Sequence, residues 1–188
     1  PAASSKTYVI SEGVTLGNQV EAAQNKSFPF DRDYVLFLGT IEPRKNLPNA
    51  FRAFHQFLEG HADQATRVRF VIAGRPGWKT QESEDVARQV NRAWTKEAPD
   101  GVIRFLGSVT EEEKWSLLTR ASCLLFVSHQ EGFGLPILEA MSVGTAVITS
   151  PRGALAEVGG DAVIYVDPED IEAMSLAIAQ CVLLPEGV

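Results

Sequence analysis

Short apolar runs alternate with longer amphipathic segments from residue 33 to residue 184 of the chain. The runs are continuously apolar, or nearly so, which is typical of parallel strands buried on both faces of a sheet. The pattern predicts strands at residues 34–39, 68–73, 102–106, 123–127, 145–149 and 162–166.

The segments between the runs carry apolar residues three or four positions apart, the spacing of one helix face. They predict helices at residues 47–59, 80–96, 110–121, 154–158 and 168–184, and a short helix opened by Pro136. Phe51, Phe54 and Phe57 share the apolar face of the first helix, which we interpret as core packing. Thr110 and Glu113 form a capping box, so the acidic residues 111–113 are explained as a first helical turn.

Alternating strands and helices predict an α/β fold with a doubly wound parallel sheet, covered by helices on both faces. Six strands suit the order 3-2-1-4-5-6, in which the first and fourth strands are neighbours. Ligands of such folds bind at the carboxyl ends of these two strands. The loop at residues 40–46 and the corner at residues 131–139 should therefore face each other.

The corner has an unusual helix start. Gly134 and Leu135 stand where Ser, Thr, Asp or Asn would normally accept the free N–H groups of the first turn. Free N–H groups, a helix dipole and a glycine that permits close approach favour an anion such as phosphate. Glu131 precedes this anion site and Glu139 follows one turn into the helix. The alternative is a structural corner, in which Phe133, Leu135 and Leu138 belong to the core, Glu139 is solvated and water caps the N–H groups.

The facing loop carries adjacent cations, Arg44 and Lys45, between Pro43 and a helix that Asn46 could cap. Arginine offers a forked set of donors and lysine a point charge, a combination suited to a diphosphate. An ordinary solvated basic pair is the alternative. Placement at the crevice of the fold, opposite an uncapped helix and two carboxylates, favours binding of a nucleotide diphosphate with a polyol attached.

Composition removes several functional classes. The chain has 188 residues, 45% apolar and 22% charged, with a formal net charge of −7. So few surplus cations argue against a nucleic-acid binder. No G-x-G-x-x-G follows the first strand and no G-x-x-x-x-G-K-[ST] occurs, which disfavours a dinucleotide dehydrogenase and a P-loop NTPase.

The remaining reactive side chains indicate no metal site. Cys123 and Cys181 lie in apolar segments and are interpreted as buried thiols of a reducing compartment. The three histidines have no clustered spacing, and His129 could contact a sugar or bond locally. No apolar run approaches the length of a membrane span, and the N-terminus lacks the regions of a signal peptide.

The beginning of the chain differs from the rest. Residues 1–6 are small and polar, and residues 7–10 are expected to form a strand without a partner helix. We therefore expect a piece of a longer protein, with a lead-in segment at residues 1–32 before the domain at residues 33–188.

Five stretches of the sequence resemble the C-terminal, donor-binding domain of retaining glycosyltransferases of family 4, which have the two-domain GT-B architecture. They are GTIEPRKN, GRPGW, VIRFLGSVTEEEKWSLLTRAS, EGFGLPILEAMSVGTAVITS and AEVGGDAVIYVDP. The resemblance covers nearly all of residues 7–184. Its two glutamates, Glu131 and Glu139, separated by seven residues in this context, are highly specific.

The resemblance implies a nucleotide-sugar donor, bound without a required metal or other cofactor. Arg44 and Lys45 would hold the diphosphate, Glu131 would be the catalytic residue beside the donor sugar, and Glu139 would bond the ribose hydroxyls. The backbone near Val109 would lie by the base. The phosphate and sugar would meet the backbone N–H groups of Gly132, Phe133, Gly134 and Leu135.

The EPRKN and GRPGW stretches look like those of bacterial mannosyltransferases of surface polysaccharide, which implies transfer of mannose from GDP-mannose to a glycan or lipid-linked acceptor. The resemblance also implies a cytoplasmic protein, at the inner face of the membrane when full-length, whose N-terminal acceptor domain is absent here. Ala146 and Ala156 stand at positions where many relatives have proline. Thr40 replaces an arginine of some members, so the diphosphate would rest on Arg44 and Lys45 alone. A non-catalytic nucleotide-sugar sensor and a nucleotide-sugar epimerase are the alternatives.

Overall fold

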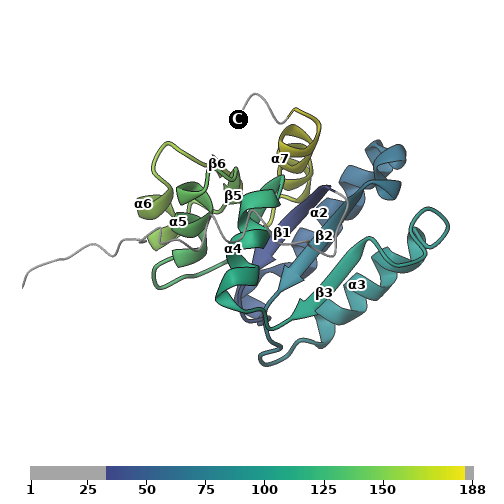
Figure 1. Ribbon diagram of the computed structural model, residues 1–188, viewed down its shortest axis with the longest axis horizontal. Coiled ribbons are helices and arrows are strands. Elements are labelled where there is room, and N and C mark those ends of the chain that lie inside the picture. Colours follow the sequence, from purple (N-terminus) through teal and green to yellow (C-terminus); the bar gives the residue numbers. More distant parts are fainter. Residues whose placement is uncertain (1–32, 185–188) are drawn as a thin grey trace, which may run out of the picture.

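The computed structural model describes residues 33–184, which form one six-stranded parallel sheet. The strand order is β3-β2-β1-β4-β5-β6, so the predicted order is confirmed (Figure 1). The strands are β1 (Asp33–Leu38), β2 (Val68–Ala73), β3 (Ile103–Gly107), β4 (Cys123–Phe126), β5 (Val147–Thr149) and β6 (Ile164–Tyr165).

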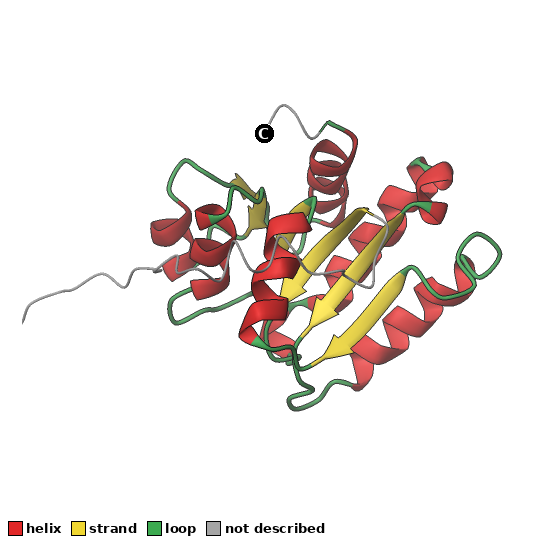
Figure 2. Cartoon of the chain, in the orientation of Figure 1, coloured by secondary structure: helices red, strands yellow, loops and turns green. Residues whose placement is uncertain are grey.

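Helices cover both faces of the sheet. Figure 2 shows α4 in front of the central strands and α2 behind them, where α2 packs against α3 and α7. The helices are α2 (Leu47–Gly60), α3 (Gln81–Ala93), α4 (Glu111–Arg120), α5 (Leu135–Ser142), α6 (Ala154–Gly159) and α7 (Ile171–Leu183). Two short 3-10 helices, η1 (Pro43–Lys45) and η2 (Ala62–Thr66), complete the described elements.

The core lies on both sides of β1 and β2, whose residues are buried except Asp33. Phe70 of β2 meets the α2 aromatics edge-on, with ring centroids 5.4 Å from Phe51 and 5.5 Å from Phe54. These contacts confirm that the aromatic face of α2 is core packing. The capping box is also confirmed, since Thr110 accepts from the N–H of Glu113 and the Glu113 carboxylate accepts from the N–H of Thr110.

Several element ends differ from the predicted ones. The last strand has two residues rather than five because β6 pairs with β5 only at Ile148 and Thr149, on one edge of the sheet. The last helix begins at Ile171 because the Asp170 side chain caps it, accepting a hydrogen bond from the N–H of Ala173.

Cys123 and Cys181 are buried free thiols, as predicted. No helix within residues 33–184 is long and apolar enough to cross a membrane. The lead-in segment expected at residues 1–32 and its strand at residues 7–10 lie outside the described residues.

Candidate functional site

The pairing of β1 with β4 brings the two loops predicted to carry the site together. The backbone N–H of His129, after β4, donates to the carbonyl oxygen of Arg44, after β1, at 2.8 Å. The Glu131 carboxylate lies between the two cations, with Oε2 2.7 Å from Arg44 Nη1 and Oε1 2.6 Å from Lys45 Nζ. Three of the predicted site residues therefore form one charged cluster.

Lys45 is the buried member of this cluster. Its ammonium lies 4.7 Å from the centre of the Phe126 ring, and burial lowers its pKa although the Glu131 carboxylate opposes that effect. Burial would by itself raise the pKa of Glu131, but hydrogen bonds from Lys45 and Arg44 hold that pKa below its ordinary value. The Arg44 guanidinium is partly exposed and also bonds the Glu42 carboxylate at 2.7 Å.

The cations owe their position to the local backbone. Pro43 opens η1, and Asn46 ends it in the left-handed region at φ 58°. The prediction that Asn46 caps the following helix is wrong: its carboxamide donates instead to the carbonyl oxygens of Val127, at 3.4 Å, and Pro168, at 2.6 Å. The loop after β1 is thus fixed to the ends of β4 and β6, because these buried carbonyl groups need a donor.

The uncapped helix start at the corner is confirmed. Gly134 is the N-cap of α5 with φ 98°, and no side chain caps the helix. A Cβ atom at Gly134 would lie 2.8 Å from Cδ2 of Leu155, so this position needs glycine. Among residues 33–184, no acceptor is bonded to the backbone N–H groups of residues 132–135. Leu135 is 43% exposed, which contradicts the alternative that it belongs to the core.

A cleft of about 290 Å³ adjoins the cluster on the side of α4 and α5. Val109 and Glu139 both line it, together with Gly39, Gly74 and Pro136. A Cβ atom at Gly74 would lie 1.9 Å from the carbonyl oxygen of Gly39, so the close approach of β1 and β2 at the cleft floor depends on this glycine.

Two cations of this cleft were missed by sequence reasoning. Lys114 of α4 lies 2.6 Å from Oε1 of Glu139 and 2.7 Å from Oε2 of Glu111. Arg75, which follows β2, also lines the cleft. The only signals in the sequence were a lysine directly after a capping box and an arginine two residues after a strand, and neither identifies its partner.

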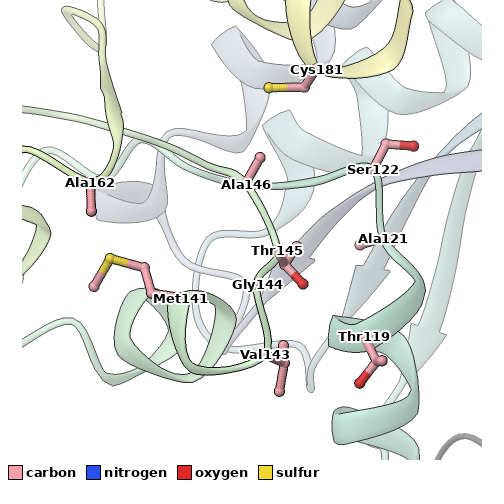
Figure 3. Close-up of a pocket in the computed structure, with 10 residues that line it drawn as sticks. All are labelled: Thr119, Ala121, Ser122, Met141, Val143, Gly144, Thr145, Ala146, Ala162 and Cys181. Atoms are coloured by element: carbon pink, nitrogen blue, oxygen red, sulfur yellow. The ribbon is translucent and has the colours of Figure 1, made fainter. Parts of the chain in front are cut away.

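His129 forms local contacts, since its Nδ1 lies 3.4 Å from Oε1 of Glu169. A larger cavity of about 380 Å³ lies elsewhere (Figure 3), lined by small residues that precede β4 and β5, such as Ser122 and Ala146. Its lining contains no cation and none of the predicted site residues. The chemistry of the molecule is therefore concentrated at the carboxyl ends of the strands.

Comparison with known proteins agrees with this geometry. The profile of the family described as glycosyl transferases group 1 matches residues 19–186. The chain belongs to this family. It shares 41% identity with O-antigen chain mannosyltransferase B of Escherichia coli over 149 residues, 78% of this chain and 36% of that protein. It shares 29% identity with D-inositol 3-phosphate glycosyltransferase of Acidothermus cellulolyticus over 174 residues, 92% of this chain and 38% of that protein.

Among solved structures, a UDP-forming α,α-trehalose-phosphate synthase from Burkholderia xenovorans superimposes on this group 1 glycosyl transferase chain with a TM-score of 0.77. The identity is 18%, over 89% of this chain and 42% of that chain. This similarity confirms the Rossmann-like fold of GT-B type. The chain spans less than half the length of these curated relatives.

Proposed function

We propose that this chain is the donor-binding half of a retaining glycosyltransferase, which transfers a hexose from a nucleotide diphosphate sugar to a glycan or lipid-linked acceptor. The observation that carries the proposal is the Glu131 carboxylate, held by both Arg44 and Lys45 beside a cluster of free backbone N–H groups. The carboxylate occupies the position in which an anionic phosphate would meet the same cations.

The proposed pose uses each of these groups. The diphosphate lies between the two cations and the N–H groups of Gly132, Phe133, Gly134 and Leu135. The ribose hydroxyls reach Glu139, and the base lies against the backbone at Val109. Glu139 supports this pose, because only its Oε1 is engaged by Lys114, and Oε2 has no hydrogen-bond partner among the described residues. The free oxygen can accept from a ribose hydroxyl.

The proposed chemistry is electrostatic. The bond between the anomeric carbon and the diphosphate breaks while the acceptor hydroxyl attacks from the same face, and the hydroxyl proton passes to the departing diphosphate. Negative charge grows on the diphosphate, where the cations and helix N–H groups stabilise it. One such donor contributes about 2.7–4 kcal/mol in comparable sites. Glu131, once released from the cations, stabilises the positive charge on the sugar ring.

We further propose that the donor is GDP-mannose and that the full-length protein acts in surface polysaccharide synthesis. The support is the name of the 41% identical relative, an O-antigen chain mannosyltransferase. Phosphatidyl-myo-inositol mannosyltransferase of Mycobacterium tuberculosis is a further mannosyltransferase, 29% identical over 95% of this chain.

Titration of the ¹⁵N-labelled chain with GDP, UDP and ADP tests the proposal. GDP should shift the amide signals of residues 44–45 and 132–135 together, with no sugar transfer by this chain alone. Absence of any shift at these residues would overturn the binding proposal. In the full-length protein, Glu131→Ala should abolish transfer; donor binding without turnover in the wild type would indicate a sensor instead.

A further inference from the structure

A second cavity lies between the first turns of α2 and α3, on the same edge of the sheet as the proposed donor site. Its volume is about 190 Å³. Its wall includes Asn49, Arg52, Lys79, Glu82, Ser83 and His129, none of which has a role in the proposed donor site. Sites that bury a drug-sized ligand have about 300–1,000 Å³. This cavity therefore suits a ligand group of about one ring.

Hydrogen-bond donors and acceptors are mixed in this cavity. Arg52 supplies a guanidinium, and the Glu82 carboxylate lies 3.7 Å from it. Asn49 and His129 add an amide and an imidazole. Each hydroxyl of a sugar both donates and accepts, so vicinal hydroxyls require such a mixture. A site for a phosphate would gain nothing from Glu82, whose charge would repel the anion.

Ser83 adds a hydroxyl group to the cavity wall. It is 5% exposed and lines the cavity, and its hydroxyl makes no hydrogen bond with any residue among 33–184. The hydroxyl oxygen itself is not fully buried, so it can bond a ligand in the cavity. The helices α2 and α3 on the two sides of the cavity both begin without a side-chain cap.

An exposed indole belongs to Trp78, the residue before Lys79 of the cavity wall. Trp78 is 55% exposed, and Lys79, which lines the cavity, lies over its ring at 5.4 Å. The indole is held in place because its Nε1–H donates to Oε2 of Glu42 at 3.0 Å. The N–H of Gly77 also donates to the carbonyl oxygen of Ile41 at 2.9 Å, which fixes the loop. A fixed aromatic surface beside a few polar groups is the usual composition of a small-molecule site.

The position of the cavity connects it with the transfer reaction. Pro43, the first residue of η1, forms part of its wall, and η1 carries Arg44 and Lys45. The N–H of His129 bonds the carbonyl oxygen of Arg44. We infer, given the proposed function, that this cavity is an acceptor subsite that takes one pyranose ring of the acceptor glycan. Arg52, Glu82 and Ser83 would bind its hydroxyls, and the exposed indole would cover its edge.

Methyl α-mannopyranoside and inorganic phosphate are suitable probes for this chain. Trp78 is the exposed tryptophan of the three, since Trp94 and Trp115 are 9% and 4% exposed. Adding the mannoside should change the fluorescence of Trp78 until the site is saturated, with a Kd of about 1–10 mM, as expected for weak binding of a single ring. It should also shift the amide signals of residues 82 and 83. Phosphate binding without mannoside binding would overturn the inference.

Arg52→Gln and Arg88→Gln form a matched pair of variants, because the two arginine side chains are 44% and 51% exposed and only Arg52 lines the cavity. Arg52→Gln should weaken mannoside binding about tenfold, which corresponds to the loss of one charge-assisted hydrogen bond. Arg88→Gln should bind the mannoside as the wild type does, and both variants should keep the wild-type affinity for GDP. In the full-length enzyme, Arg52→Gln should raise the acceptor KM and leave the donor KM and kcat unaltered. Normal GDP binding with no mannoside response would refute the acceptor subsite alone, whereas failure of both would refute the donor site as well.

Discussion

Replacing Glu131 with glutamine should tighten GDP binding by this chain, although the same change should abolish sugar transfer by the full-length enzyme. The Glu131 carboxylate bonds Arg44 and Lys45, so the diphosphate must displace it or share the two cations with it. Glutamine keeps the shape of the side chain and removes the charge that competes with the phosphates. Affinity and catalysis should therefore change in opposite directions.

The expected gain follows from the exposure of the two contacts. The Lys45 contact is buried, with side chains 7% and 8% exposed, and buried hydrogen bonds to charged groups contribute about 1.5–3 kcal/mol. The Arg44 contact contributes about 0–1 kcal/mol, because 42% of that side chain is exposed. The diphosphate can share donors with the carboxylate, so we expect a net gain of about 1–2 kcal/mol, or a Kd about 5–30 times lower.

Isothermal titration calorimetry of wild type, Glu131→Gln and Glu42→Gln measures this effect. Glu42 also bonds Arg44 but does not contact Lys45, so its variant should tighten GDP binding about threefold or less. Without ligand, Glu131→Gln should melt at a lower temperature, because it leaves the Lys45 ammonium buried beside a neutral group. Weaker or equal GDP binding by Glu131→Gln would show that the carboxylate does not compete for the cations.

Three further predictions concern single groups of the site. Lys114→Met should weaken GDP binding about tenfold, since Glu139 loses a charge-assisted hydrogen bond and repels the diphosphate; Lys114→Arg should retain affinity, and equal calorimetric values for both variants would contradict this role. Gly134→Ala should lower the free energy of unfolding in urea by about 1–3 kcal/mol, because alanine is disfavoured at φ 98° and meets Leu155; unchanged stability would place the corner in another conformation. The folded pKa of Glu131 is lowered, so its stabilising contribution is complete above the unfolded value of about 4.3 and is lost as the pH falls through the folded value. When unfolding is measured from pH 7 to pH 2, the difference in stability between wild type and Glu131→Gln should shrink below about pH 4. A difference that stays constant would contradict the stabilising role of the charged Glu131 carboxylate.

The fold could be predicted from the sequence because its signals are local and repeated. Runs such as residues 34–38 are apolar at every position, and the helices between them are amphipathic, so strand type and order followed from general rules of α/β folds. The ends of β6 and α7 could not be placed. The length of β6 depends on how many residues its one neighbour can pair, and the start of α7 depends on the Asp170 cap.

The site could be predicted only as far as the backbone determines it. The strand order brings residues 44–45 and 131 to one edge, and the glycine at position 134 indicates an uncapped helix. The side-chain partners depend on contacts between residues far apart in the chain. Lys114 bonds Glu139 across 25 positions, and Asn46 bonds the carbonyl oxygen of Pro168 across 122. Sequence periodicity carries no signal of such pairs.

The structure of this chain with GDP would test most directly whether the loops after β1 and β4 bind one diphosphate together. We expect phosphate oxygens within hydrogen-bond distance of Lys45 Nζ and of at least two N–H groups among residues 132–135, with Glu131 displaced from Lys45. GDP bound away from either loop, or Glu131 still bonded to both cations with the nucleotide in place, would contradict it.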